Sequence, residues 1–258
     1  MQYLFSALDM AFFTLLYESD LPEVVADPLG KVSEKKLAKL QSEFFSRWQK
    51  VDLLKMEGDT VILDNRLAKC LAPIYDGDIA VKHLHTAWVR QTDYDKIFYI
   101  SKRHGVVLLK NVRGMYELHY YKDLCACHDA FLNEFDLSAT NEFSGVVFKI
   151  CENAVLIESL FENHEQKQKK MLEDFSSEHH ISVDYLNKIL TSVLKDKQNN
   201  IVEVARKENV KLGGIMVKLV PENQYMMRFI ASPDGNLISL ESYSSSDILH
   251  KIINFEGR

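Results

Sequence analysis

The stretch from Lys211 to Phe255 constrains the fold more than any other part of the chain, because its apolar residues alternate along three short runs. Alternation at every second position is typical of a half-buried β-strand. The runs are Ile215–Val220, Tyr225–Ile230 and Leu237–Ser242. A Ser-Pro-Asp-Gly-Asn sequence at 232–236 supplies the second turn, since Pro presets φ and Gly permits a positive φ. This stretch predicts an antiparallel meander.

The alternation also predicts which side chains share a face of this meander. One face is expected to carry Ile215, Val217, Leu219, Tyr225, Met227, Phe229, Ile238 and Leu240. After the third strand, Ser244–Asp247 offers several oxygen atoms that can cap a helix N-terminus. A helix should then close the meander, because apolar residues recur at helical spacing at Ile248, Leu249, Ile252 and Phe255.

A second meander is predicted between Ile79 and Tyr121. Its candidate strands are Ile79–Val89, Lys96–Ser101, Val106–Lys110 and Met115–Tyr121, separated by clusters of Gly, Asn, Asp and charged residues. Alternation places Ile97 and Tyr99 on one face of the second strand. Such a sheet needs a helical cover to be stable, and Asp123–Phe135 is expected to begin that cover.

The N-terminal region is predicted to begin with a short strand and two helices. A strand at Tyr3–Ser6 precedes a buried helix that extends to about Ser19 and is ended by Leu21-Pro22, since Pro disfavours helix in the residue before it. An amphipathic helix should follow from Ser33 to about Lys50, because Ser33 is a candidate N-cap and apolar residues follow at helical spacing.

A small hairpin and a short helix are expected next. Leu53–Leu63 should fold around a Glu-Gly-Asp turn, and Asp64 should cap a helix that Pro73 stops. The order helix, hairpin, helix resembles a fragment of a winged-helix domain. Four lysines at the start of the longer helix could then contact phosphates, although a solvated helix face explains them equally well: Lys31, Lys35, Lys36 and Lys39.

The central region is predicted to be a helical hairpin spanning about 137–195. Leu137–Phe175 has apolar residues at helical spacing, which indicates one long helix or two collinear ones. Ser182 is a candidate cap for the second helix, whose apolar residues lie on one side: Leu186, Ile189, Leu190, Val193 and Leu194. The segment Asn199–Val210 fits a helix or a strand equally well.

These elements predict an α+β fold with two antiparallel β-meanders, at about 79–121 and 213–242, packed with helices and a central helical hairpin. No linker rich in Pro, Gly or Ser divides the chain, so residues 1–258 are expected to form a single domain. Its N-terminal helix, hairpin and meander half covers 1–135, the helical hairpin 136–198, and the C-terminal meander with its helix 199–258.

The composition disfavours some classes of function. A formal net charge of −6 and a pI near 5.9 argue against a dedicated nucleic-acid binder, which normally presents a basic face. No early segment resembles a secretory signal, and no apolar run approaches the roughly 20 residues that cross a bilayer. The four scattered cysteines are expected to be reduced thiols of a cytoplasmic protein: Cys70, Cys125, Cys127 and Cys151.

His83 and His85 are the best candidates for a metal site, because residues two apart in a strand face the same side. Further possible ligands are His119, Cys125, Cys127 and His128. On a helix, however, the two cysteines diverge by about 200° and cannot hold one ion. A polar sheet face with buried thiols explains these residues more simply, so no metal and no cofactor are expected.

The sequence contains none of the common short catalytic motifs. It lacks a G-x-S-x-G elbow, a P-loop, a G-x-G-x-x-G sequence opening a helix, and an H-E-x-x-H pair. Asp93 and Asp95 lie at a predicted turn, where Asp is favoured for local hydrogen bonds. The chain is therefore expected not to be an enzyme, with a small metal-dependent enzyme using His83 and His85 as an alternative.

Aromatic side chains in the first meander are candidate contacts for a protein partner, because they bury much area at low entropic cost. About half of the aromatic side chains in this meander should instead fill the core between the sheet and its helices. The predicted partner-binding residues are Trp88, Asp93, Tyr94, Asp95 and Tyr99. Within this set the turn Asp93-Tyr94-Asp95 is the first choice, as an exposed aromatic residue flanked by charge.

Two segments carry a resemblance to a known family. Residues 48–86, WQKVDLLKMEGDTVILDNRLAKCLAPIYDGDIAVKHLHT, combine a helix end, a Gly-Asp-Thr-Val hairpin, a Leu-rich helix and the first strand of a sheet. Residues 213–255 combine three strands, an Asp-Gly turn and a final helix. In this order of elements the chain resembles the EspG-like cytosolic chaperones of type VII (ESX) secretion systems, including the EsaE-type chaperones. The Arg- and Ala-rich composition of the mycobacterial members is absent.

The resemblance implies a non-enzymatic binding protein that works without ATP. It would hold a helical type VII secretion substrate soluble in the cytoplasm and deliver it to the secretion machinery. Physically, it would cover an apolar helical tip that would otherwise self-associate. The implied partner is a secreted helical protein, with no nucleic acid and no direct membrane span. The resemblance does not specify an oligomeric state. A winged-helix-like regulatory protein is the further alternative.

Overall fold

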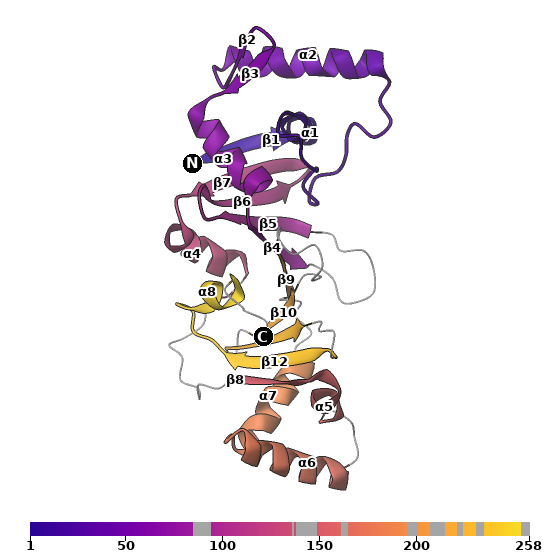
Figure 1. Cartoon of the computed structure of the whole chain (residues 1–258), viewed down its shortest axis with the longest axis vertical. Coiled ribbons are helices and arrows are strands. Elements are labelled where there is room, and N and C mark those ends of the chain that lie inside the picture. Colours follow the sequence, from indigo (N-terminus) through magenta and orange to yellow (C-terminus); the bar gives the residue numbers. More distant parts are fainter. Residues whose placement is uncertain are drawn as a thin grey trace. The chain divides into compact units, whose positions relative to one another are not determined.

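The structure is a computed structural model, and it describes residues 1–84, 94–135, 137, 149–160, 165–195, 201–206, 215–220, 224–230 and 235–253. The chain divides into two compact units (Figure 1). The first comprises Met1–Lys82 and Asp93–Cys127, and the second comprises His83–Thr92 and His128–Arg258. Each unit combines antiparallel strands with helices, which confirms the predicted α+β class. That the whole chain folds as a single domain stays a prediction.

The sheet of the first unit contains the predicted meander. Its strand order is β1-β7-β6-β5-β4, with β1 (Gln2–Ser6), β4 (Ile79–Leu84), β5 (Tyr94–Ser101), β6 (Gly105–Val112) and β7 (Met115–Tyr121). The four predicted strands are confirmed at their positions, although residues 85–89 of the first one lie outside the described residues. The N-terminal strand β1 adds to the free side of β7, where Phe5 stands opposite Tyr116.

Three helices and a hairpin complete the first unit: α1 (Ala7–Leu16), α2 (Glu34–Lys50), β2 (Leu54–Glu57), β3 (Thr60–Leu63) and α3 (Asn65–Asp76). Ser6 caps α1 through a reciprocal pair of hydrogen bonds with Asp9. The helix ends at Leu16, short of the predicted end near Ser19, and Tyr17 forms its C-cap. The hairpin forms where predicted, with Gly58 at φ +62°.

The prediction that Pro73 stops α3 was wrong, because the helix continues through this residue to Asp76. A proline inside a helix loses one backbone hydrogen bond. Here the turn that follows is buried, and the Tyr75 hydroxyl lies 3.1 Å from Thr14 Oγ1. We attribute the continuation to this packing, which offsets the lost bond.

One face of the first sheet builds the core of this unit. Ile97 stands opposite Leu109, which in turn stands opposite Leu118, so the three side chains share that face. They pack with buried residues of α1, α2 and α3 in one apolar cluster. Tyr99 packs against the same cluster, which confirms that Ile97 and Tyr99 share a face.

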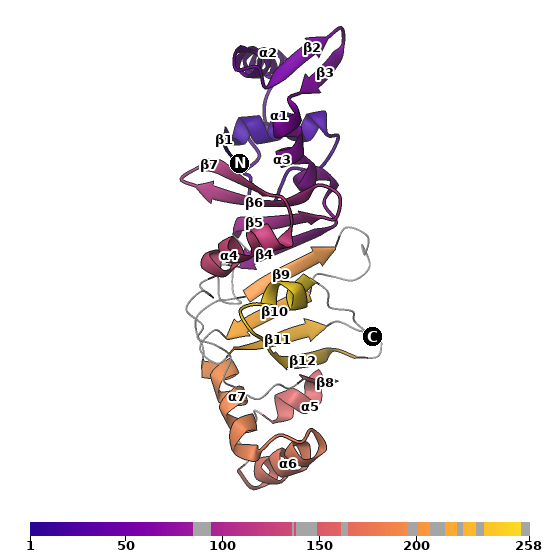
Figure 2. The ribbon, with the colours of Figure 1, turned by 90° about the vertical axis from the view of Figure 1, so that its left-hand side faces the viewer.

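The second unit contains the C-terminal meander that the alternation predicts. Its sheet has the order β9-β10-β11-β12-β8, with β8 (Lys149–Asn153), β9 (Ile201–Arg206), β10 (Ile215–Val220), β11 (Tyr225–Ile230) and β12 (Leu237–Ser242). Its helices are α5 (Ala154–Ser159), α6 (Glu165–Glu178), α7 (Val183–Lys195) and the closing helix α8 (Ile248–Ile253), and α4 (Leu124–Glu134) crosses the sequence boundary between the units. Figure 2 shows the four strands β9 to β12 side by side.

The prediction of a continuous helical segment from Leu137 to Phe175 was wrong, because β8 interrupts it. Ile150 of β8 pairs with Leu240 of β12, far along the chain, and is buried in the second core. Local periodicity cannot reveal a partner so distant in sequence. The predicted helical hairpin is reduced to the contacting pair α6 and α7, and the ambiguous segment before β10 contains strand β9.

The predicted face of β10 was also wrong. Val217 stands opposite Arg228 and Leu219 opposite Met226, so these two strand residues lie away from Tyr225 and Met227. The face with Tyr225 and Met227 packs into the core that α5, α6 and α7 share. Because apolar residues occur on both faces of β10, with Lys218 as the one charged residue, alternation fixes the strand but not its face.

The other face of this sheet holds a buried ionic network beneath α8. Arg228 is 1% exposed, and its Nη1 donates to Glu241 Oε2 at 2.6 Å while Nη2 donates to the Lys251 carbonyl at 3.0 Å. Lys251 Nζ lies 3.1 Å from Glu241 Oε1. Burial alone would raise the pKa of Glu241, but these two cations outweigh it and hold the pKa below its ordinary value.

The sign of the resulting pH dependence follows from that shift. Because the folded-state pKa of Glu241 lies below the unfolded one, unfolding at low pH takes up a proton. The stabilisation from the ionised carboxylate is therefore complete above the unfolded pKa. It is lost as the pH falls through the folded pKa.

Candidate binding surface

Helix α2 buries only a narrow stripe of its surface. Its apolar residues at helical spacing, Leu37, Leu40, Phe44 and Trp48, face the first core, and among all its residues only Phe44 is fully buried. The remaining sides of the helix are exposed or half-buried. A helix held by one stripe leaves the rest of its surface available to a partner.

A buried carboxylate fixes the position of α2 against α1. The Asp9 side chain is 5% exposed, and its Oδ1 pairs with Arg47 and accepts a hydrogen bond from Trp48 Nε1 at 2.9 Å. Its Oδ2 accepts from Ser6 N at 2.9 Å and from Ser6 Oγ at 2.6 Å. The Trp48 ring also meets Phe5 edge-on at 5.3 Å between centroids. These contacts hold α2 in one place.

The β2–β3 hairpin returns the chain alongside α2. Leu53 N donates to the Trp48 carbonyl at 3.1 Å, so the hairpin starts directly from the end of the helix. Leu54 is fully buried, and two residues further along the same face of β2 comes Met56, opposite Val61. The buried Leu54 thus positions Met56 beside α2.

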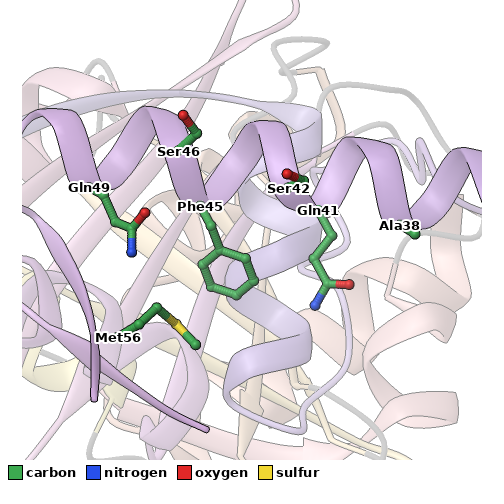
Figure 3. Close-up of a pocket in the computed structure, with 7 residues that line it drawn as sticks. All are labelled: Ala38, Gln41, Ser42, Phe45, Ser46, Gln49 and Met56. Atoms are coloured by element: carbon green, nitrogen blue, oxygen red, sulfur yellow. The ribbon is translucent and has the colours of Figure 1, made fainter. Parts of the chain in front are cut away.

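A shallow hollow of about 410 Å³ lies between α2 and β2 (Figure 3). It is lined by Ala38, Gln41, Ser42, Phe45, Ser46, Gln49 and Met56, none of which is charged. Figure 3 shows Gln41, Phe45 and Gln49 projecting from one side of α2. Phe45 is half-buried and Met56 is 41% exposed, so two apolar side chains meet solvent at its centre. We call this hollow the α2 groove.

The flank of the α2 groove is basic although the chain is acidic. Between residues 31 and 50 there are six cationic side chains (Lys31, Lys35, Lys36, Lys39, Arg47 and Lys50) and two anionic ones (Glu34 and Glu43). All five lysines are exposed, and Lys39 forms a surface pair with Glu43 at 3.7 Å. At about 100° per residue, Lys35 and Lys39 lie next to the groove residues Ser42 and Ser46.

The residues that the sequence singles out for partner binding are described only in part. Trp88 and Asp93 lie outside the described residues. The prediction that Tyr94 and Asp95 lie in a turn was wrong, because both belong to strand β5; their side chains are not described. Tyr99 is half-buried on the core-facing side of β5. Burial, and then the nearby Glu23 and Tyr75, raise the pKa of Tyr99. Their role in binding stays a prediction.

The candidate metal ligands are dispersed where the structure describes them. His119 Nε2 lies 3.2 Å from Glu117 Oε2 on β7, and His128 Nε2 donates to the Ser245 carbonyl at 2.7 Å. Cys125 is exposed and Cys127 is buried. Within the described ranges no group of three or more His, Cys, Asp or Glu side chains is placed to hold a metal ion. The backbone of His83 belongs to β4, and His85 lies outside those ranges.

Sequence reasoning missed the α2 groove because five of its seven lining residues are small or polar. The signal that could have found it is the uncharged stripe Ala38, Ser42, Phe45 and Gln49, which recurs at helical spacing within a highly charged helix. Of the helices described, none has the length and apolar character needed to cross a bilayer.

Neither a protein-family model nor a curated protein matches this sequence. Among solved structures, the chain is similar to that of the Mycobacterium tuberculosis type VII secretion system chaperone EspG5 in complex with a PE25-PPE41 dimer. The sequence identity is 9%, the TM-score is 0.46, and the match covers 100% of this chain and 99% of that chain.

Proposed function

We propose that this protein binds a helical segment of another protein in the α2 groove. The observation that supports this most is the shape and lining of the groove: it is shallow and uncharged, with the half-buried Phe45 and the exposed Met56 at its centre. Sites for small molecules enclose most of their ligand, whereas a helix binds in an open groove through a few apolar anchors.

The length of the groove suits a short helix. Residues 38 to 49 span about 16 Å at 1.5 Å per residue, which is about three helical turns. Ala38, Ser42 and Ser46 are small, so a partner backbone can approach α2 closely at these positions. Phe45 and Met56 then offer two contacts to an apolar stripe with a spacing of three or four residues.

The finer proposal is that the partner is a helical substrate of a type VII (ESX) secretion system, which this protein keeps soluble in the cytoplasm without catalysis. Its basis is the resemblance of residues 48–86 and 213–255 to the EspG-like chaperones. The hairpin that borders the groove belongs to the first of these segments. The start of β5, Tyr94 and Asp95, together with Asp93 before it, remains a second proposed contact.

The test is a pull-down from the native host, with mass spectrometry of the captured chains. Three baits are compared: the wild-type protein, Ser42→Tyr and Thr60→Tyr. Ser42 lines the groove and is exposed, so Tyr fills the groove without disturbing the core. Thr60 is exposed on β3, opposite Glu57 on the hairpin face away from Met56, and is the matched control.

The proposal expects the wild-type protein and Thr60→Tyr to capture the same helical secreted protein, and Ser42→Tyr to lose it. Equal capture by all three baits would show that the groove is not the binding site. Recovery of nucleic acid or a small metabolite in place of a protein would overturn the proposed function itself.

A further inference from the structure

We infer that the α2 groove is built for an acidic amphipathic helix, whose carboxylates meet the lysines beside the groove. This inference rests on the proposed function and specifies the chemistry of the partner. The groove supplies an uncharged centre, and Lys35 and Lys39 supply the charge along its outer rim. A helix with an apolar stripe bordered by Asp or Glu would satisfy both parts at once.

The placement of these lysines argues for a role in binding. Positive charge near a helix N-terminus opposes the helix macrodipole, which favours acidic side chains there. In α2 the first turn nevertheless contains Lys35 beside the groove, with Glu34 as its acidic residue, and Lys39 follows one turn later. A local arrangement that costs helix stability is expected mainly at functional surfaces.

The charge balance points to an anionic partner more specifically. Between residues 31 and 50 there are six cationic and two anionic side chains, whereas the whole chain has a net charge of −6. Arg47 is paired with Asp9, so the five exposed lysines provide the excess positive charge. The basic surface is therefore local, because the rest of the chain is acidic. An anionic group is attracted to this helix in particular. Such steering speeds association and selects among partners.

The centre of the groove favours a polypeptide over a nucleic acid. Nucleic-acid sites combine basic residues with exposed aromatic faces or with groups that reach the bases. Here the half-buried Phe45 packs against Phe44, at 5.5 Å between ring centroids, and its neighbour is the flexible apolar side chain of Met56. Methionine adapts its shape to apolar side chains of a partner helix.

The experiment uses two synthetic fluorescein-labelled helical peptides and the full-length protein, with binding followed by fluorescence anisotropy. Both peptides have the same Leu stripe; one has Glu and the other Lys at the flanking positions. The protein variants are Lys35→Glu/Lys39→Glu and the matched control Lys36→Glu/Lys69→Glu. Both variants replace two lysines by glutamates, so they change the net charge equally. In the control, Lys36 lies on the far side of α2 from the groove and Lys69 is exposed on α3.

The Glu peptide is expected to bind the wild-type protein at least about tenfold more tightly than the Lys peptide. The Lys35→Glu/Lys39→Glu variant should weaken the Glu peptide by about tenfold, and the control variant by less than about twofold. Raising the salt from about 0.1 M to about 1 M should weaken the Glu peptide, because the screening length falls from about 10 Å to about 3 Å. Circular dichroism checks that each variant is folded, and Lys35→Gln/Lys39→Gln replaces the first variant if it is not.

The outcomes separate the two claims. Equal affinity for both peptides, with both lost in Ser42→Tyr, overturns the acidic partner and leaves the groove as a helix-binding site. Equal loss in the two charge variants also overturns the inference. If neither peptide binds, the proposed function fails as well. If a labelled DNA duplex binds and the peptides do not, the partner is a nucleic acid and both claims are wrong.

Discussion

Removing the Asp9 carboxylate is predicted to destabilise the first unit and release α2. The side chain receives three hydrogen bonds at 2.6 to 2.9 Å, two from Ser6 and one from Trp48, and pairs with Arg47. Asp9→Ala removes all of these acceptors at once. These contacts connect α1 to α2, so the position of the α2 groove depends on the Asp9 carboxylate.

The magnitude follows from the separate contacts. Loss of the capping box costs about 1 kcal/mol. Loss of a charged acceptor for Trp48 Nε1 costs about 1–2 kcal/mol. The Arg47 side chain is 50% exposed, so solvent screens its pair with Asp9 and the contribution is about 0.5 kcal/mol. Together Asp9→Ala should lower the free energy of unfolding by about 3 kcal/mol.

The assay is urea unfolding followed by far-ultraviolet circular dichroism, arranged as double-mutant cycles. Asp9→Ala is combined with Trp48→Phe in one cycle and with Arg47→Ala in another. Trp48→Phe keeps an aromatic ring and removes the N–H donor. Glu43→Ala, which removes an exposed carboxylate from α2, is the control and should change the stability by less than about 0.5 kcal/mol.

The coupling energy between Asp9 and Trp48 should exceed that between Asp9 and Arg47, because the indole bond is better shielded than the half-exposed guanidinium. A loss below about 1 kcal/mol for Asp9→Ala, or a coupling to Trp48 near zero, would refute the reasoning. Either result would mean that aromatic packing alone holds α2 in place.

Three further predictions concern other parts of the chain. In urea unfolding, Gly105→Ala should lower the free energy of unfolding by about 1–3 kcal/mol more than Gly114→Ala. Both glycines have a positive φ, so the backbone strain is common to the two variants. A Cβ on Gly105 would lie 2.6 Å from the Tyr121 carbonyl oxygen, whereas a Cβ on Gly114 would have nothing within 4 Å. In Glu241→Gln the free energy of unfolding should fall less steeply at acid pH than in the wild-type protein, because the lowered pKa of Glu241 contributes to that fall. An equally steep fall in both proteins would contradict the ionic network. At neutral pH the exposed thiols of Cys125 and Cys151 should react quickly with a maleimide, and the buried thiols of Cys70 and Cys127 slowly, as counted by mass spectrometry. Burial raises the pKa of Cys70 to about 11 and that of Cys127 to about 12. Fast labelling of all four thiols would contradict the core packing.

Local patterns predicted most of the elements correctly. Alternation located β10, β11 and β12, and helical spacing after a capping residue located α2 and α7. These signals are local, because side-chain periodicity and capping are set by neighbouring residues. The α+β class follows from the elements alone.

The errors arose where a distant partner decides the structure. Lys149–Asn153 is a strand because β12 lies beside it, and α3 passes Pro73 because the following turn is buried. The face of β10 depends on its register with β11, which two apolar faces leave undetermined in the sequence. The α2 groove was missed because a hollow arises from the packing of a helix against a hairpin, and the uncharged stripe of α2 alone does not show that the hairpin lies beside it.

The most direct test of the central claim is photo-crosslinking in the native host. Benzoylphenylalanine replaces Gln49 in the α2 groove, Tyr94 at the start of β5, or the control Thr60 in separate strains. After irradiation, the adducts are identified by mass spectrometry. A helical secreted protein attached at position 49, and absent at position 60, is the predicted result. Adducts formed only at position 94, or none at position 49, would contradict the assignment of the groove as the binding surface.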